Sequence, residues 1–180
     1  MGGMSDAPGN LDWQPALDRP ELVAPPTALA LEGLGVECLV APVDPELADT
    51  AAFCEAYGVE LAESANCVVV EGRRGEATRM AACMVLATDR ADVNKAVRKH
   101  LEVRKISFAS METATSLTGM EYGGITPIGL PGDWPVLVDQ RVADAGWVVI
   151  GGGVRGSKIA IQGSDLARLP GAEVIALAQV

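Results

Sequence analysis

Apolar positions gather along the chain in short blocks that predict strands separated by helices. Residues 36–41, 66–70 and 79–86 are almost continuously apolar, which is typical of buried strands. Gly72-Arg-Arg-Gly75 lies between the last two blocks and predicts a hairpin turn. Because neither arm of this hairpin has a polar face, we expect both to lie in the middle of a sheet that is covered on both sides.

Helical periodicity and capping residues predict helices between these strands. Residues 26–33 begin with proline and end with glycine, and Asp44-Pro45 begins an apolar stripe that continues to Gly58. By the same signals, further helices are expected after Asp89 or Asp92, over residues 110–117 and over residues 164–169. Strands are also expected over residues 134–139, 147–150, 157–162 and 173–177. Mixed hairpins and helices indicate an α+β fold, a single domain with a curved mixed β-sheet flanked by helices.

The N-terminal residues differ from the rest in composition. Residues 1–12 are rich in Gly, Ser, Asp and Pro, and Trp13, Leu17 and Leu22 follow among prolines. We therefore expect residues 1–25 to form a flexible or irregular arm, and residues 26–180 to form the domain. No secretory signal or apolar run of transmembrane length is visible, so a cytoplasmic location is expected, with no membrane partner.

Charge and residue counts exclude several classes of function. The 180-residue chain has a net charge of −10, which argues against binding DNA or other nucleic acid by broad phosphate neutralisation. One local basic run, Arg98-Lys-His100 with Arg104-Lys105, is either a solvated helix face or a set of phosphate contacts. The four cysteines form no CxxC pair and His100 is the only histidine, so we expect neither a metal site nor a cofactor.

Catalytic triads and dinucleotide binding are also disfavoured. His100 lies in a polar run away from any Ser or Cys motif, and Cys67, between apolar neighbours, is interpreted as a buried thiol rather than a nucleophile. Gly151-x-Gly-x-x-Gly156 matches the dinucleotide fingerprint formally. However, alternating residues follow it, whereas the fingerprint should open a helix, so we interpret the segment as a hairpin turn.

The most unusual segment is Thr118-Gly-Met-Glu-Tyr-Gly-Gly-Ile-Thr-Pro-Ile-Gly-Leu-Pro-Gly132. Gly123 and Gly124 permit close approach of bare backbone, and the prolines fix the path of the chain. This composition suits either a loop that contacts a ligand or a tight surface turn.

The order of the flanking motifs carries a resemblance to a known family. Tyr122-Gly-Gly-Ile-Thr-Pro-Ile-Gly129 is followed by Pro135-Val-Leu-Val-Asp139 and then by Gly151-Gly-Gly-Val-Arg-Gly156. Together these resemble the YbaK / prolyl-tRNA-synthetase-associated editing domain over residues 44–169. Family members are aminoacyl-tRNA deacylases, or binding proteins descended from them.

The resemblance implies a site that works by positioning. An aminoacyl ester is already activated, so the site has to hold the carbonyl with backbone N–H donors and admit water. The expected catalytic residues are Asn66, Gly123, Gly124 and Ile125. The expected substrate-binding residues are Met120, Tyr122, Thr126, Pro127, Asp139, Gly152, Gly153, Arg155, Ser157 and Lys158; Asp139 is equally plausible as a helix cap.

The sequence departs from the family at two positions. The deacylases carry a lysine at the start of the first central strand, where this chain has Ala65, and commonly carry an aspartate after the Arg-Gly turn, where it has Lys158. We hypothesise that the positive charge has moved across the pocket to Lys158, opposite Asn66; the alternative is a lysine that faces solvent.

Two functions remain open at this point. One is a freestanding deacylase that hydrolyses the ester of a small amino acid mischarged on tRNA. The other is a catalytically altered binding module that recognises an aminoacyl group, an amino-acid-like metabolite or a synthetase partner. The expected partner is the aminoacyl 3′ end of tRNA, alone or with an aminoacyl-tRNA synthetase, and the protein is expected to be a monomer or homodimer.

Overall fold

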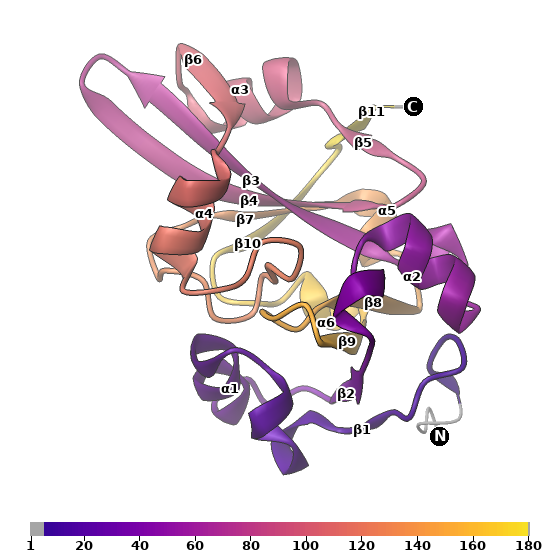
Figure 1. Cartoon of the computed structure of the whole chain (residues 1–180). Coiled ribbons are helices and arrows are strands. Elements are labelled where there is room, and N and C mark those ends of the chain that lie inside the picture. Colours follow the sequence, from indigo (N-terminus) through magenta and orange to yellow (C-terminus); the bar gives the residue numbers. More distant parts are fainter. Residues whose placement is uncertain (1–5, 180) are drawn as a thin grey trace.

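A computed structural model describes residues 6–179, and its strands are divided between two main sheets (Figure 1). The first sheet is antiparallel, with the order β1 (Gln14–Pro15), β2 (Cys38–Pro42), β9 (Ser157–Gln162) and β8 (Trp147–Gly151). The second sheet is mixed, with the order β10 (Ala172–Ile175), β7 (Val136–Asp139), β4 (Ala77–Leu86), β3 (Ala65–Arg74) and β6 (Lys105–Phe108). A small ribbon pairs β5 (Arg90–Ala91) with β11 (Ala178–Gln179).

Short helices connect and cover these strands. The α-helices are α1 (Pro25–Glu32), α2 (Thr50–Tyr57), α3 (Arg98–Leu101), α4 (Met111–Thr118), α5 (Gln140–Ala143) and α6 (Gly163–Leu166). Single 3-10 turns occur at η2 (Ala16–Asp18), η3 (Pro20–Leu22), η4 (Pro45–Leu47) and η5 (Leu61–Glu63), and η6 (Val93–Val97) is a π-helical turn that leads into α3. Among the described residues, no helix has the length and apolar character needed to cross a membrane.

The two sheets face each other across the largest hydrophobic core. Ile150 and Ile159 of the first sheet pack in one cluster with Met84 and Val138 of the second. The opposite face of the mixed sheet packs beneath α3, and the opposite face of the first sheet packs beneath α2. Alternation along β4 assigns Cys83 and Met84 to different clusters, as the pleat of a strand requires. The predicted α+β fold, with helices flanking a mixed sheet, is confirmed.

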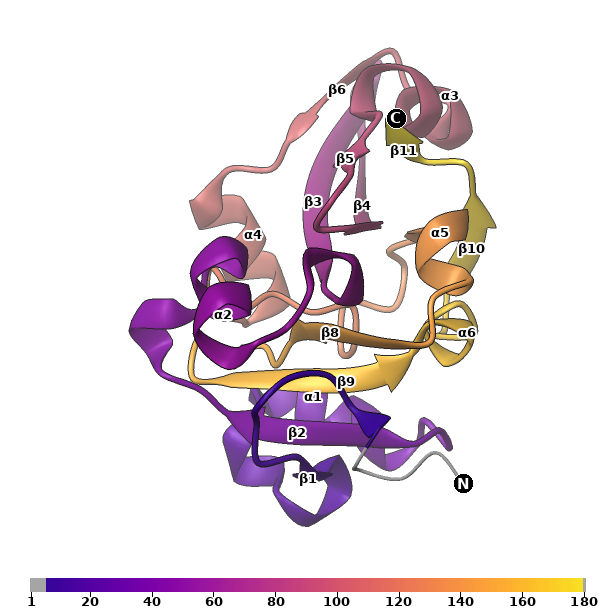
Figure 2. The ribbon, with the colours of Figure 1, turned by 90° about the vertical axis from the view of Figure 1, so that its right-hand side faces the viewer.

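The hairpin of β3 and β4 runs through the upper half of the molecule in Figure 2 and contains the two strands that were predicted to be doubly covered. The two strands pair from Ala65 with Leu86 to Arg74 with Ala77. The turn therefore lies at residues 75–76, beyond the expected 72–75, because Gly72 and Arg73 still pair with β4. The central position holds for β4, which lies between β3 and β7. Strand β3 is also interior, since it lies between β4 and the short edge strand β6, which pairs with residues 70–73 of β3.

The helix expected from Asp44 to Gly58 is wrong as a single element. Asp44 caps a single turn, η4, by accepting from the Glu46 N–H, and Asp49 then adopts an extended conformation with ψ 137°. Helix α2 begins only at Thr50. The break leaves the carbonyl of Ala48 without a helical partner, and Lys158 Nζ donates a hydrogen bond to this carbonyl at 2.9 Å. The break in the helix is therefore accompanied by a hydrogen bond between two residues that lie far apart in the sequence.

Other predicted boundaries are close to those of the structure. Asp92, one of the two alternatives, caps the segment before α3, and Ser110 caps α4. The Gly151–Gly156 motif forms the turn of the β8–β9 hairpin, in agreement with its predicted role. The basic run is not a single helix face, since Lys105 begins strand β6.

The described part of the predicted N-terminal arm, residues 6–25, packs against the first sheet. Trp13 is buried, and its Nε1 donates to the Pro8 carbonyl at 2.9 Å. Gln14 and Pro15 pair with β2 as strand β1. Residues 1–5, which fall within the predicted arm, lie outside the described residues.

Candidate functional site

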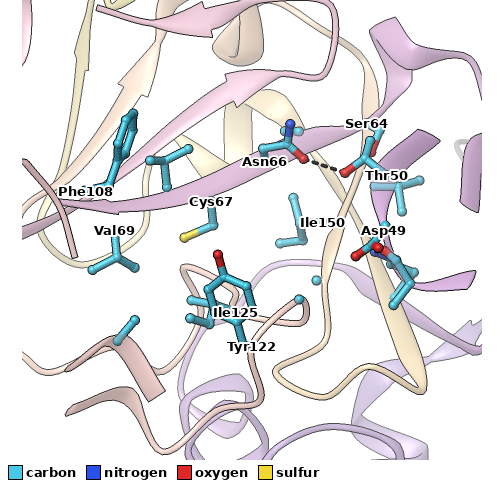
Figure 3. A pocket seen from close by; sticks show the side chains of 18 of the residues that line it. Asp49, Thr50, Ser64, Asn66, Cys67, Val69, Phe108, Tyr122, Ile125 and Ile150 are labelled. Carbon is cyan, nitrogen blue, oxygen red and sulfur yellow. Dashed lines mark hydrogen bonds between the residues drawn. The ribbon is translucent and has the colours of Figure 1, made fainter. Parts of the chain in front are cut away.

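A cavity of about 390 Å³ opens between the start of β3, the start of α2 and the glycine-rich loop (Figure 3). Asn66, Cys67 and Val69 contribute from β3, and Tyr122 and Ile125 from the loop. The remaining lining residues are Ala48, Asp49, Thr50, Ser64, Ala65, Val68, Phe108, Ala109, Ala114, Gly123, Val149, Ile150, Gly151 and Lys158. The cavity combines an apolar wall with a few polar groups, which is typical of small-molecule sites.

The glycine-rich loop is fixed to the β8–β9 turn by backbone hydrogen bonds. Gly153 N donates to the Gly124 carbonyl at 2.7 Å, and Glu121 N donates to the Gly153 carbonyl at 2.9 Å. Gly153 has a φ of +84°, a conformation that glycine adopts without strain. Gly124 needs its missing side chain, because a Cβ there would lie 2.5 Å from the Val154 carbonyl carbon and oxygen.

These hydrogen bonds correct the expected set of backbone donors. Gly124 N already donates to the Glu121 carbonyl at 2.9 Å, and Gly124 does not line the cavity. Gly123 and Ile125 do line it, and within residues 6–179 the structure records no acceptor for either N–H. The loop therefore offers two candidate donors rather than three, and Gly124 acts as its internal support.

Arg155 links three segments around the loop. Its Nε donates to the Pro45 carbonyl at 3.1 Å and its Nη1 donates to the Tyr122 carbonyl at 3.4 Å. Nη1 also lies 3.6 Å from the Asp49 carboxylate, while the Arg155 N–H donates to Glu121 at 2.7 Å. Arg155 does not line the cavity, so its contacts position the loop and η4 rather than a substrate.

Lys158 is buried in the cavity wall, with 8% of its surface exposed, so the solvent-facing alternative is wrong. Its Nζ donates to the Ala48 carbonyl at 2.9 Å and lies 4.9 Å from the Phe53 ring centroid. Burial lowers the pKa of Lys158 to about 8, because removal from water disfavours the ammonium form. At neutral pH the side chain is therefore still mainly charged.

Asn66 lines the same cavity, beside the N-terminus of α2. Its Oδ1 accepts from Thr50 Oγ1 at 2.7 Å (Figure 3). The structure records no acceptor for Asn66 Nδ2 among residues 6–179, which leaves the amide able to donate to a bound ligand. Thr50 thus holds Asn66, and the Ala48 carbonyl holds Lys158. Both contacts come from the short segment 48–50.

Cys67 points into the cavity in Figure 3 but has no thiolate character. Burial raises the pKa of the Cys67 thiol well above its ordinary value, with a smaller contribution from Cys83. A thiol held in its protonated form is a poor nucleophile. The interpretation of Cys67 as a non-catalytic thiol therefore agrees with its environment.

The other predicted site residues lie outside the cavity lining. Thr126 donates its backbone N–H to the buried Met120 sulfur at 3.5 Å, and Ser157 is fully buried beside Gly152. Pro127 lines a separate apolar hollow near α1. Of the predicted residues, Asn66, Gly123, Ile125, Tyr122 and Lys158 are brought together.

Asp139 does not line the cavity either, and its carboxylate is used structurally. Its Oδ2 accepts from the Arg141 N–H as the cap of α5. Its Oδ1 accepts from the N–H groups of Leu177 and Ala178, each at 2.9 Å. The helix-cap alternative therefore accounts for Asp139.

Sequence reasoning did not identify Asp49, Thr50 and Phe108 as part of the site. The signal for Thr50 was present, since Asp49-Thr50 is a typical helix start, but the earlier Asp44-Pro45 start obscured it. Phe108 ends the short edge strand β6, just after the basic run, and has no sequence signal of its own. Within the described residues, no group of three or more His, Cys, Asp or Glu side chains is arranged to hold a metal ion.

Comparison with known proteins identifies the family of this chain. The model of the aminoacyl-tRNA editing domain matches residues 44–169. That match covers most of the chain, so the chain belongs to the aminoacyl-tRNA editing domain family, and the resemblance drawn from its motifs is confirmed. Membership links the protein to aminoacyl-tRNA editing, with tRNA or a synthetase as its partner.

Solved structures share the fold at low sequence identity. A candidate trans-editing enzyme for prolyl tRNA synthetase is 21% identical with a TM-score of 0.72, covering 88% of this chain and 99% of its own. A hypothetical protein is 19% identical with a TM-score of 0.76, covering 86% and 99%. A scaffold used for computational epitope grafting is 22% identical with a TM-score of 0.73, covering 87% and 97%. At these identities the similarity demonstrates the fold alone.

Proposed function

We propose that this protein is a freestanding aminoacyl-tRNA deacylase that hydrolyses the ester of a small amino acid mischarged on tRNA. The observation that carries the proposal is the joint position of Gly123, Ile125, Asn66 and Lys158 around one cavity of about 390 Å³. Its apolar wall, which includes Val69 and Ile150, suits a small side chain. Membership of the editing family supports the ester as the substrate class.

In this proposal, water attacks the carbonyl carbon of the ester, and the bond from that carbon to the ribose oxygen breaks. The ribose oxygen takes a proton, and the free amino acid leaves as its carboxylate. The Gly123 and Ile125 N–H groups stabilise the negative charge that develops on the carbonyl oxygen. Asn66 Nδ2 orients the substrate, because Thr50 fixes the other half of its amide.

Lys158 supplies the positive charge that family deacylases carry at the position of Ala65. Both residues line the cavity, Ala65 from β3 and Lys158 from β9. Between them lies β8, which pairs with Lys158 at Gly151 and contacts Ser64 through Val149. The relocated ammonium group therefore reaches the same space from the opposite sheet.

The second candidate is a binding module that recognises an aminoacyl group without hydrolysing it. Two observations favour it: the family lysine is absent at Ala65, and the Gly124 N–H is already bonded within the loop. Such a protein would hold the ligand through the same cavity.

The two candidates are separated by measuring hydrolysis of Ala-, Ser- and Cys-tRNA for proline by the wild type, Asn66→Ala and Lys158→Ala. A deacylase exceeds the spontaneous rate, and each variant lowers kcat/KM by about 10-fold or more, the loss of one charged or oriented hydrogen bond. No turnover by a folded wild type that binds an aminoacyl analogue would support the binding module. Unchanged activity and affinity in Lys158→Ala would contradict the relocated charge.

A further inference from the structure

The basic residues of this acidic protein are concentrated in one part of the chain. Residues 71–105 contain nine of the fourteen Lys and Arg but only five of the twenty-four Asp and Glu, a local net charge of +4. The whole chain has a net charge of −10. In three dimensions this segment comprises the end of the β3–β4 hairpin, the whole of β4, β5, η6, α3 and the start of β6. The hairpin end and α3 lie away from α2 (Figures 1 and 2).

Four of these cations line one groove. The groove is formed by Glu71, Arg73, Asn94, Arg98, Arg104, Lys105, Ile106 and Ser107. Arg73 and Lys105 are direct cross-strand partners on β3 and β6, an arrangement of like charges that destabilises an isolated sheet. Glu71 lies 4.0 Å from Arg73, and within residues 6–179 no carboxylate forms an ion pair with Arg98, Arg104 or Lys105. The groove therefore has an excess of positive charge that an anion would relieve.

The groove is connected to the candidate active site by shared lining residues. Asn94, Ile106 and Ser107 line both the basic groove and a neighbouring hollow. That hollow in turn shares Asn66, Val68 and Phe108 with the cavity of the site. A continuous path thus runs along β3 and β6 from the cavity to the cations. Seven residues of extended strand separate Asn66 from Arg73, a length of about 23 Å.

Phe108 lies on this path at the margin of the cavity (Figure 3). It is 66% exposed, although it is one of only two phenylalanines in the chain. An exposed aromatic ring beside a basic groove offers a stacking surface for a nucleobase.

We propose that the groove of Arg73, Arg98, Arg104 and Lys105 binds the phosphates of the tRNA acceptor arm, while Phe108 stacks on a base near its 3′ end. This inference rests on the proposed function, which places the aminoacyl ester in the adjoining cavity. At a rise of about 3.4 Å per nucleotide, the path spans about seven nucleotides, the 3′ tail and the first part of the stem. The acidic remainder of the surface repels the rest of the tRNA and confines binding to this path.

The test compares Arg73→Glu, Arg104→Glu and Phe108→Ala with Arg168→Glu, a reversal of an exposed arginine that follows α6 and does not line the path. Binding of uncharged tRNA is measured by fluorescence anisotropy at several salt concentrations. We expect each groove reversal to weaken binding by about 10-fold and to reduce the salt slope by about one per phosphate lost. Phe108→Ala weakens binding without changing the slope, and Arg168→Glu leaves both unchanged. Thermal melting verifies that every variant is folded.

Hydrolysis provides a second, independent measurement. On aminoacyl-tRNA the groove reversals raise KM and leave kcat unchanged, whereas on an aminoacyl-adenosine ester, which is too short to reach the groove, they have no effect. Binding that is equal in Arg104→Glu and Arg168→Glu, or a wild type that does not bind tRNA, overturns the groove proposal. Binding that is lost only in the groove variants, without ester hydrolysis by the wild type, supports the groove and overturns the deacylase. If the groove variants lose binding to DNA and to tRNA equally, the groove binds polyanions in general, and its assignment to tRNA is overturned.

Discussion

The ammonium nitrogen of Lys158 lies 4.9 Å from the centroid of the Phe53 ring, inside the wall of the candidate active site. Lys158 comes from β9 and Phe53 from α2, so the contact depends on how the first sheet packs beneath that helix. It holds a charge in a buried position, where charges are costly unless they have partners. The Ala48 carbonyl is the hydrogen-bonding partner that the structure provides.

Burial of Lys158 predicts a specific dependence of stability on pH. The folded pKa is about 8, against about 10.4 in an unfolded chain, so between these values the unfolded state binds more protons. The free energy of unfolding should therefore rise with pH across this window, by an amount on the order of 3 kcal/mol. Lys158→Met should lack the rise and be more stable than the wild type below pH 8. Urea denaturation at pH 7 and pH 10 measures the difference, and parallel pH profiles for both proteins would contradict the buried charge.

Gly124 is predicted to be intolerant of any side chain. The Cβ of Gly124→Ala would overlap the Val154 carbonyl, so the loop and the β8–β9 turn would have to separate. We expect a loss of about 1–3 kcal/mol of stability, the usual cost of overpacking, together with a fall in ligand affinity. Gly132→Ala is the control, since nothing lies within 4 Å of a Cβ at that position of the same segment. Equal melting temperatures for the two variants would refute the close contact.

Asp139 should affect stability and not substrate affinity. Its carboxylate accepts three backbone N–H groups, which Asp139→Ala would leave without that partner. We expect a loss of about 2–4 kcal/mol, as for buried hydrogen bonds to a charged group. The exposed Asp133, a residue near the same strand, provides the control through Asp133→Ala. A raised KM in Asp139→Ala with unchanged stability would instead indicate that Asp139 contacts the substrate.

Cys67 should be dispensable for chemistry despite its position in the cavity. Because burial keeps its thiol protonated, Cys67→Ala should retain kcat within about 3-fold, with a change in KM that reflects the altered cavity shape. Deacylation kinetics under single-turnover conditions test this directly. Loss of more than 100-fold in kcat would show that the thiol takes part in the reaction.

Local signals in the sequence determined much of the fold. The β3–β4 hairpin, the cap of α4 at Ser110 and the turn of the β8–β9 hairpin follow from apolar runs, capping residues and glycines that act over a few positions. The order of the motifs also sufficed to identify the family. Gly123, Ile125 and Tyr122 could be named as candidate site residues because they stand in one of those motifs, and Asn66 because of the resemblance at the start of the first central strand.

Tertiary structure alone decided which groups face the cavity and which are used elsewhere. The Asp139 carboxylate looks available in the sequence, but it accepts hydrogen bonds from the backbone N–H groups of Leu177 and Ala178, which folding brings near. The break before Thr50 and the burial of Lys158 arise together, through a hydrogen bond between residues 110 positions apart. The basic groove likewise combines β3, α3 and β6. Such features depend on packing between distant segments, for which no local pattern of residues carries the information.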